Sequence, residues 1–264
     1  MRLHDVLQVL EEMAPLRYAE SWDNVGLLVG DRAATIRKVL VTVDYTEAVA
    51  EEARGGADLV VAYHPPLFSA VKRVPHEALW ADAIRRGIAL YSPHTALDVA
   101  REGTNDVLAD ACGVSTTDRR PLREHVAKPG RAEPPGIGLG RVGAVTSAAS
   151  RRDLVARVKE ALGLSYVLAS GPLDSNAARV AVAAGAGGEL LADAIAAGAD
   201  VFVTGEIRHH DALAAAQKGV TVVATLHSNS ERVAVKAFAA RLAARLAPLD
   251  VAFSGSDADP FTVV

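Results

Sequence analysis

Short apolar runs rich in β-branched residues alternate with segments of helical spacing, and this alternation constrains the fold more than any other feature. In the first half of the chain the apolar runs occupy residues 38–44, 58–62 and 89–91. Helical spacing marks residues 3–13, 46–54, 77–86 and 105–112. Strands that alternate with helices favour a mainly parallel sheet covered by helices on both faces. The pattern therefore predicts an α/β fold with three layers.

A second α/β set follows an interruption at residues 119–140. This segment holds four prolines and several glycines, and we interpret it as a connector or an irregular excursion. After it we predict strands at residues 143–145, 166–169, 178–183, 201–204, 221–225 and 250–253, and helices at 152–162, 189–197, 209–217 and 230–246. A chain of 264 residues is long enough for two domains of ~100–150 residues each. We therefore expect two linked α/β domains with mainly parallel or mixed sheets.

Composition and charge exclude several classes of protein. The net charge is −4 and no long basic run appears, so nucleic-acid binding is disfavoured. A single cysteine, Cys112, permits no intrachain disulfide and no cysteine-only zinc motif. No apolar run reaches the ~18–20 residues of a membrane span, and the N-terminus lacks the apolar stretch of a signal peptide. We expect a cytoplasmic protein that does not enter a membrane.

Histidines and carboxylates follow three of the predicted strands. His64 comes directly after residues 58–62, and residues 92–98, predicted as a loop, contain His94 and Asp98. His227 follows residues 221–225, and Glu231 comes four positions later. Open α/β sheets bind ligands beyond the carboxyl ends of their strands. Imidazole nitrogens and carboxylate oxygens are ligands that zinc, manganese and iron(II) accept.

Glu231 lies on the same helical face as His227 if both stand in the first turns of a helix. A carboxylate there could bridge two cations, and two ions ~3.5–4 Å apart lower the pKa of a bridging water. The competing interpretation is that each strand-end histidine is a helix cap or a hydrogen-bonded core residue. The hypothesis of a metal site depends on a shared position: all three groups of histidines and carboxylates follow the carboxyl end of a predicted strand.

Two further segments have alternative interpretations. Residues 185–188 (GAGG) could cradle a phosphate at a helix N-terminus, but a tight strand-to-helix turn is favoured because the dinucleotide and P-loop spacings are absent. Glu206, His209 and His210 could line the cavity and contact substrate, or could simply form a loop and the first turn of a helix. No G-x-S-x-G nucleophile elbow occurs, so Ser-His-Asp catalysis is not supported.

Five short motifs, taken in order, give the chain a resemblance to a known family. They are residues 22–27 (WDNVGL), 63–68 (YHPPLF), 94–98 (HTALD), 204–206 (TGE) and 227–232 (HSNSER). In these motifs the sequence resembles the GTP cyclohydrolase I type 2 homologue family, whose members are toroidal hexamers with dinuclear metal centres. The resemblance covers nearly the whole chain.

The resemblance implies a domain division and a set of metal ligands. Residues 1–118 with 226–264 would form the first domain and residues 119–225 the second, with the metal site between them. By analogy the site holds two divalent ions (zinc, iron or manganese) through His64, Asp98, His227 and Glu231, with His94 as a further ligand and Glu231 as the bridge. The resemblance also implies self-association as a homohexamer.

One position departs from the family pattern. Many members carry two adjacent histidines where this chain has Tyr63 and His64. Tyr63 could ligate as a phenolate, could hydrogen-bond a metal-bound water, or could leave one metal site weak. We therefore predict unequal occupancy of the two sites, which two equally tight ions per chain would contradict. The chain also lacks the inserted domain of longer members, which would enter near residues 119–140.

These observations support two functional hypotheses. In the first, the protein is a metal-dependent hydrolase in which a metal-bound hydroxide attacks a cyclic amide, an imide or a purine-like ring, with His94 and Glu231 as catalytic residues. In the second, it is a non-catalytic metal-binding or regulatory hexameric ring that engages protein partners. The sequence does not identify the small-molecule substrate, since likeness of fold does not fix it.

Overall fold

The computed structural model describes residues 1–126 and 133–264, without the side chains of residues 147–149. The described chain divides into two compact units. The first comprises Met1–Leu97 and Val235–Val264, and the second comprises Asp98–Ala234. The domain boundaries derived from the resemblance, after residues 118 and 225, stay a prediction.

The first unit is built on a five-stranded mixed sheet. Its strand order is β1-β4-β3-β2-β12, and only β1 runs antiparallel to its neighbour. The strands are β1 (Gly26–Val29), β2 (Lys38–Thr42), β3 (Leu59–Ala62), β4 (Ala89–Ser92) and β12 (Asp250–Phe253). The three strands predicted in the first half of the chain, and the final strand, are therefore confirmed.

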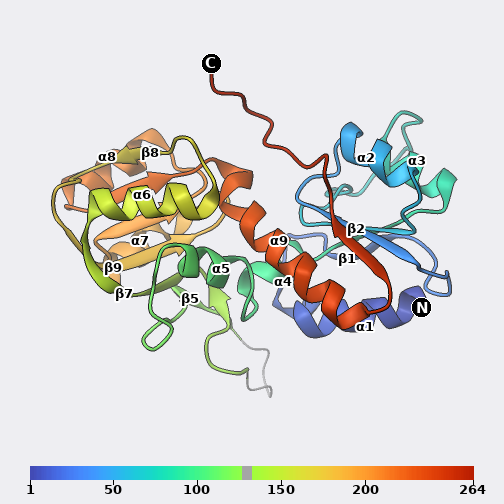
Figure 1. The fold of residues 1–264 in the computed structure, drawn as a ribbon, viewed down its shortest axis with the longest axis horizontal. Coiled ribbons are helices and arrows are strands. Elements are labelled where there is room, and N and C mark those ends of the chain that lie inside the picture. The colour runs from blue at the N-terminus through green and yellow to red at the C-terminus, as the bar shows by residue number, and fades with distance from the viewer. Residues whose placement is uncertain (127–132) are drawn as a thin grey trace. The chain divides into compact units, whose positions relative to one another are not determined.

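Helices cover both faces of this sheet (Figure 1). One face packs against α1 (Leu3–Met13) and the C-terminal part of α9 (His227–Leu246), and the other against α2 (Glu47–Arg54) and α3 (Leu79–Arg86). Successive side chains of a strand point to opposite faces of the sheet. Val39 and Val41 therefore pack on the face covered by α1 and α9, and Leu40 packs on the face covered by α2 and α3. A short 3₁₀ helix, η1 (Leu16–Tyr18), follows α1.

The second unit repeats the three-layer plan. Its sheet has the order β7-β9-β10-β11-β8, with β9, β10 and β11 parallel and the two outer strands antiparallel. The strands are β7 (Arg141–Ser150), β8 (Leu168–Ser170), β9 (Asn176–Ala183), β10 (Val201–Thr204) and β11 (Thr221–Ala224). The helices are α5 (Thr104–Ala111) and α6 (Arg151–Leu162) on one face, with η2 (Gly187–Leu190), α7 (Leu191–Ala196) and α8 (His209–Gln217) on the other. The predicted α/β fold class is confirmed.

Residues 92–98, predicted as a loop, are mostly helical. The helix α4 (His94–Val99) begins at His94, so the prediction of a loop was wrong. The Asp23 carboxylate accepts a hydrogen bond from the backbone N–H of Thr95 at 3.2 Å and another from the Thr95 hydroxyl. Such a cap satisfies an N–H group that the first helical turn leaves unpaired. Because the cap comes from 72 residues away in the chain, local sequence did not reveal the helix.

The predicted connector at residues 119–140 contains a short β-ladder. Strands β5 (Arg123–Glu124) and β6 (Gly138–Leu139) pair antiparallel, and residues 127–132 lie outside the described part of the chain. Close by, the buried Arg141 guanidinium bonds the Asp106 carboxylate at 2.7 Å and donates to the carbonyls of Gly138 and Gly140. A buried guanidinium is tolerated because its charge is paired and its N–H groups find acceptors.

The structure bears on two further expectations, one about membrane-spanning helices and one about the single cysteine. Within the described ranges, no helix has the length and apolar character needed to cross a bilayer. The thiol of Cys112 is buried, and burial raises its pKa to about 12. A thiol with such a pKa is protonated at neutral pH, so Cys112 is a packing residue rather than a nucleophile.

Candidate metal centre

In the first unit, His64 is held at the carboxyl end of β3 by a neighbouring carboxylate. Its Nδ1 lies 2.8 Å from Oδ1 of Asp44, which follows the adjacent strand β2. A carboxylate only accepts hydrogen bonds, so Nδ1 carries the proton, and the ring in its neutral form presents the lone pair of Nε2. This carboxylate–histidine arrangement fixes the orientation of metal-binding imidazoles in many proteins.

His94 has the same kind of support. Its Nδ1 lies 2.8 Å from Oδ1 of Asp23, whose side chain is buried. Burial alone would raise the pKa of the Asp23 carboxyl, but hydrogen bonds from His94 and Thr95 outweigh it and hold the pKa below its ordinary value. Asp23 is therefore a carboxylate at neutral pH, and it both caps α4 and orients the first side chain of that helix.

The two imidazoles lie close together over a buried tyrosine. The ring centroids of His64 and His94 are 5.3 Å apart, with an interplanar angle of 79°. The Tyr63 ring lies 5.0 Å from the His64 ring and 5.5 Å from the His94 ring. The first unit thus brings together three of the residues that the sequence placed at the site: His64, His94 and Tyr63.

An exposed aromatic pair borders His94. The Trp22 ring meets the His94 ring edge-on at 6.2 Å and lies 6.1 Å from the Phe68 ring. Trp22 is 60% exposed and Phe68 is 49% exposed, values that are high for side chains of this size. Asn24 ties the two loops together, because its side-chain amide donates to the Leu67 carbonyl at 2.5 Å. The pair offers flat apolar surface beside an imidazole.

In the second unit, His227 and Glu231 stand one turn apart at the start of α9. His227 Nε2 lies 3.3 Å from Oε1 of the buried Glu231, and His227 Nδ1 lies 3.2 Å from Oε1 of Glu206. Helix α9 starts at His227, three residues before the predicted start, which puts both side chains in its first turns. Glu206 follows β10 and thereby supports His227 as Asp44 supports His64.

Glycine at position 185 leaves room for these two side chains. A Cβ atom there would lie 2.6 Å from Glu231 Oε1 and 3.3 Å from His227 Nε2, and the residue has a φ of +65°. The Gly185 N–H donates to the Ser230 hydroxyl at 2.8 Å, and that hydroxyl donates to the His227 carbonyl at 2.7 Å. The segment interpreted above as a tight turn is such a turn, and it forms the wall of a cradle around a carboxylate and an imidazole.

Backbone strain occurs next to the candidate metal ligands of both units. His94 has a φ of 24° and Leu226, directly before His227, has a φ of 70°. Residues other than glycine rarely adopt positive φ, and such strain concentrates at functional sites. In each group the strain falls on, or next to, a histidine that begins a helix.

The other predicted site residues lie on helices α4 and α8. Asp98 stands on α4 four positions after His94, and its carbonyl accepts a hydrogen bond from the Asn105 amide at 3.1 Å. His209 and His210 begin α8 as exposed side chains, with ring centroids 5.3 Å apart. Both residues therefore stand in the first turn of α8, and a role for them in contacting substrate stays a prediction.

Four supporting residues escaped the sequence analysis: Asp23, Asp44, Gly185 as a steric requirement, and Ser230. Asp44 ends a predicted strand, and Asp23 lies in the first of the five motifs, so both positions carried a signal. The signal was incomplete because neither position indicates which histidine the carboxylate contacts.

Residues 1–260 of the chain match the family model described as Duf34/NIF3 (NGG1p interacting factor 3). The chain is 35% identical to the "Protein NIF3 homolog" of Schizosaccharomyces pombe, covering 97% of this chain and 96% of that protein. It is 31% identical to the "GTP cyclohydrolase 1 type 2 homolog" of Clostridium perfringens, covering 88% and 87% respectively. Among solved structures, a Staphylococcus aureus hypothetical protein superposes with a TM-score of 0.89 at 28% identity, covering 100% of this chain and 99% of that one.

Proposed function

The chain belongs to the Duf34/NIF3 (NGG1p interacting factor 3) family, and on that premise we propose that it is a metal-dependent hydrolase of planar cyclic substrates. The resemblance to the GTP cyclohydrolase I type 2 homologues is confirmed, because a relative at 31% identity carries that name. The observation that carries the proposal is the pair of imidazoles, His64 and His94, each oriented through Nδ1 by a carboxylate.

The donor chemistry of each unit fits a divalent cation. The first unit offers two oriented imidazoles, and the second offers an imidazole and a buried carboxylate that a Cβ atom at position 185 would crowd. Histidine and carboxylate together suit zinc, iron and manganese. The proposed ligands of two such ions are His64, His94, Asp98, His227 and Glu231, with Glu231 as the bridge.

When bound, the ions would supply an activated water and a Lewis acid. The chain's own residues would orient the ligands and bind the substrate. Asp44 and Asp23 hold the protons on Nδ1 of His64 and His94, which keeps each Nε2 available. Trp22 and Phe68 would stack on a flat ring and exclude water from one side of it. His94 and Glu231 are the residues that would touch the reacting atoms. These roles favour a cyclic amide, an imide or a purine-like ring.

Metal analysis combined with a turnover screen tests the proposal. Metal-loaded protein would be assayed against hydantoin, dihydrouracil and GTP, with His64→Ala as the test variant and the exposed His76→Ala as its matched control. We expect turnover of at least one ring substrate, a loss of at least about 100-fold in His64→Ala, and no change in His76→Ala. Activity that survives in His64→Ala would refute the proposal, and bound metal without turnover would favour the regulatory ring.

Replacing Asp23 by asparagine should weaken metal binding without unfolding the protein. An amide can accept from Nδ1 of His94 but lacks the negative charge that makes the imidazole a stronger ligand. We expect metal affinity to fall by about 10–100-fold, as for other residues that orient metal ligands. Competition with a chromophoric chelator measures the affinity. An unchanged affinity would show that the contact between Asp23 and His94 serves only to cap α4.

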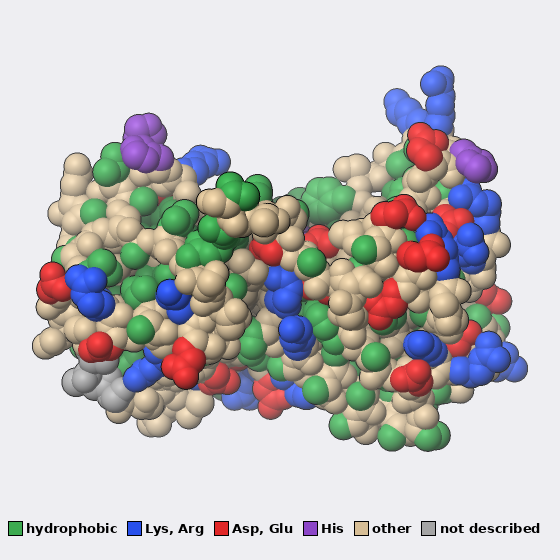
Figure 2. All heavy atoms as spheres, turned by 45° about the horizontal axis from the view of Figure 1, so that its top comes forward, with side chains coloured by type: hydrophobic (Ala, Val, Ile, Leu, Met, Phe, Trp, Pro, Cys, Tyr) green, Lys and Arg blue, Asp and Glu red, His purple; other side chains and the backbone are tan. Residues whose placement is uncertain are grey.

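Assembly and environment are part of the same proposal. We expect a homohexamer in the cytoplasm, which light scattering on purified protein and cell fractionation would check. On the face drawn in Figure 2, Lys and Arg side chains are interspersed with Asp and Glu. This distribution supports a small-molecule substrate rather than nucleic acid. Because Tyr63 replaces a histidine, metal analysis should also find unequal occupancy of the two sites.

A further inference from the structure

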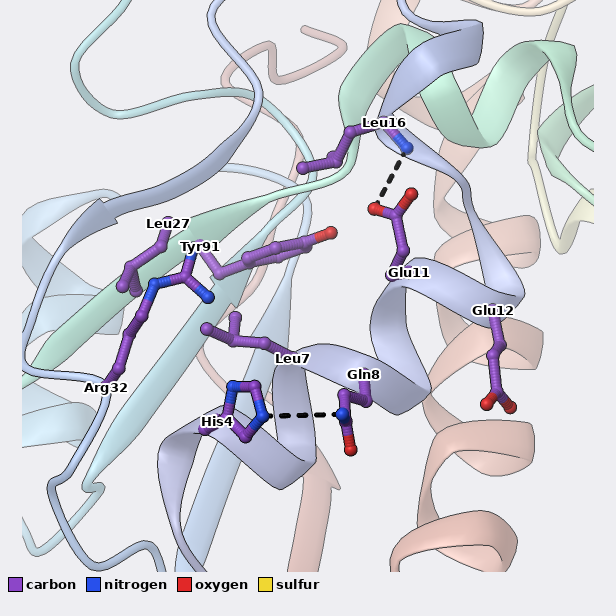
Figure 3. Close-up of a pocket in the computed structure, with 9 residues that line it drawn as sticks. All are labelled: His4, Leu7, Gln8, Glu11, Glu12, Leu16, Leu27, Arg32 and Tyr91. Atoms are coloured by element: carbon purple, nitrogen blue, oxygen red, sulfur yellow. Dashed lines mark hydrogen bonds between the residues drawn. The ribbon is translucent and has the colours of Figure 1, made fainter.

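A pocket in the first unit lies beneath helix α1 and has no role in the proposed hydrolysis. It has a volume of about 490 Å³, within the ~300–1,000 Å³ of small-molecule sites. None of the proposed metal ligands lines it. Apolar side chains of Leu7, Leu16, Leu27 and Tyr91 form much of its surface, and charged side chains stand around them (Figure 3).

The hydroxyl of Tyr91 is the unusual feature of this pocket. Tyr91 is 2% exposed, and its hydroxyl has no hydrogen-bond partner in the described part of the protein. Burial, and then the negative charge of Glu11, raise the pKa of this phenol well above its ordinary value. A buried hydroxyl without a partner costs about 1–3 kcal/mol, so an arriving polar group that satisfied it would be favoured.

Charges of opposite sign flank the Tyr91 ring. Figure 3 shows the hydroxyl directed toward the side where Glu11 lies, while Arg32 lies at the opposite end of the side chain. The Glu11 carboxylate is held in place by the backbone N–H of Leu16, which donates to Oε2 at 3.2 Å. The Arg32 guanidinium has no side-chain partner among the described residues. The pocket therefore has an acceptor end, a cationic end and apolar surface between them.

We infer that this pocket binds a dipeptide-sized zwitterion with an apolar side chain. The ligand ammonium donates to Glu11 and to the Tyr91 hydroxyl, and the ligand carboxylate pairs with Arg32. The apolar side chain packs on Leu7 and Leu27. Because Glu11 and Arg32 lie at opposite ends of the Tyr91 side chain in Figure 3, a ligand that reaches both needs its charged groups further apart than those of an α-amino acid. A dipeptide provides that separation.

Calorimetric titration of the full chain with Gly-Leu tests this inference and is independent of any metal. We expect binding of Gly-Leu, and affinity at least about tenfold lower for both N-acetyl-Gly-Leu and Gly-Leu-amide, since each lacks one charged contact. Arg32→Gln should weaken Gly-Leu by about tenfold yet leave the affinity for Gly-Leu-amide unchanged. Tyr91→Phe should weaken Gly-Leu by about three- to tenfold.

Matched variants keep the test decisive. Arg73→Gln and Tyr45→Phe change the same residue types outside the pocket and should leave the affinity unchanged. Tyr91→Phe should melt at the same temperature as the parent or higher, because it removes an unpaired buried hydroxyl, so weaker binding would not reflect unfolding. The absence of heat at about 10 mM peptide would overturn the inference. Equal affinity for the three peptides, or a crystal structure with only water or a second copy in the pocket, would overturn it as well.

Discussion

Replacement of Gly185 by alanine is expected to weaken the proposed metal binding strongly. The new Cβ would lie 2.6 Å from Glu231 Oε1 and 3.3 Å from His227 Nε2, distances at which these side chains must move. Moving a carboxylate and an imidazole out of position should lower metal affinity by at least about 10–100-fold. The positive φ of +65° adds about 1–2 kcal/mol of strain to the folded state.

Gly198→Ala provides the matched control for this substitution. Gly198 also lies in the second unit and has a φ of +74°, but no atom lies within 4 Å of the position its Cβ would take. We expect the control to lose a similar amount of stability in thermal melts while it keeps its metal. If both variants retain metal equally in elemental analysis, the space next to Glu231 has no part in metal binding.

Glu231→Gln should have the largest effect on activity. Glutamine keeps the shape of the buried side chain but removes the charge, and a neutral amide oxygen neither neutralises nor bridges cations well. We expect at least about a 100-fold loss of turnover, with metal content falling in parallel. Metal analysis and initial rates on the same preparation would measure both quantities.

Two comparisons separate this loss from unfolding. Glu160→Gln changes an exposed glutamate on α6 and should retain both metal and rate. Metal-free Glu231→Gln should show the same circular-dichroism spectrum as the metal-free parent. If Glu231→Gln binds metal as tightly as the parent, Glu231 is not a ligand, and the assignment of the bridge fails.

The sequence predicted the layers of the fold well, because burial on both faces of a parallel sheet leaves a strong local pattern. The run at residues 201–204, for example, is β10, with all four side chains buried. Helix α4 was missed because the group that caps it, Asp23, is far away in the chain. Strand β1 was not predicted, since an edge strand of four residues carries little periodicity.

The candidate site was predictable in its residue types more than in its geometry. Strand ends revealed His64, His94 and His227, because chain order alone places them after buried runs. The pairing of Asp44 with His64 depends on strand order, since β2 and β3 are neighbours in the sheet. The requirement for glycine at position 185 depends on the helix start at His227, which the sequence placed three residues later. Contacts of this kind follow from tertiary packing, which no local pattern encodes.

The ladder of β5 and β6 closes the base of the segment between them, and Arg141 fastens that base to α5 through Asp106. A segment whose two ends are already fixed side by side can grow at little cost, since each doubling of its length adds only about 0.6 kcal/mol of closure entropy. The fold thus offers a site for insertions between β5 and β6. A fluorescent reporter or an additional folded module could be spliced in after Val126 while both sheets keep their registers.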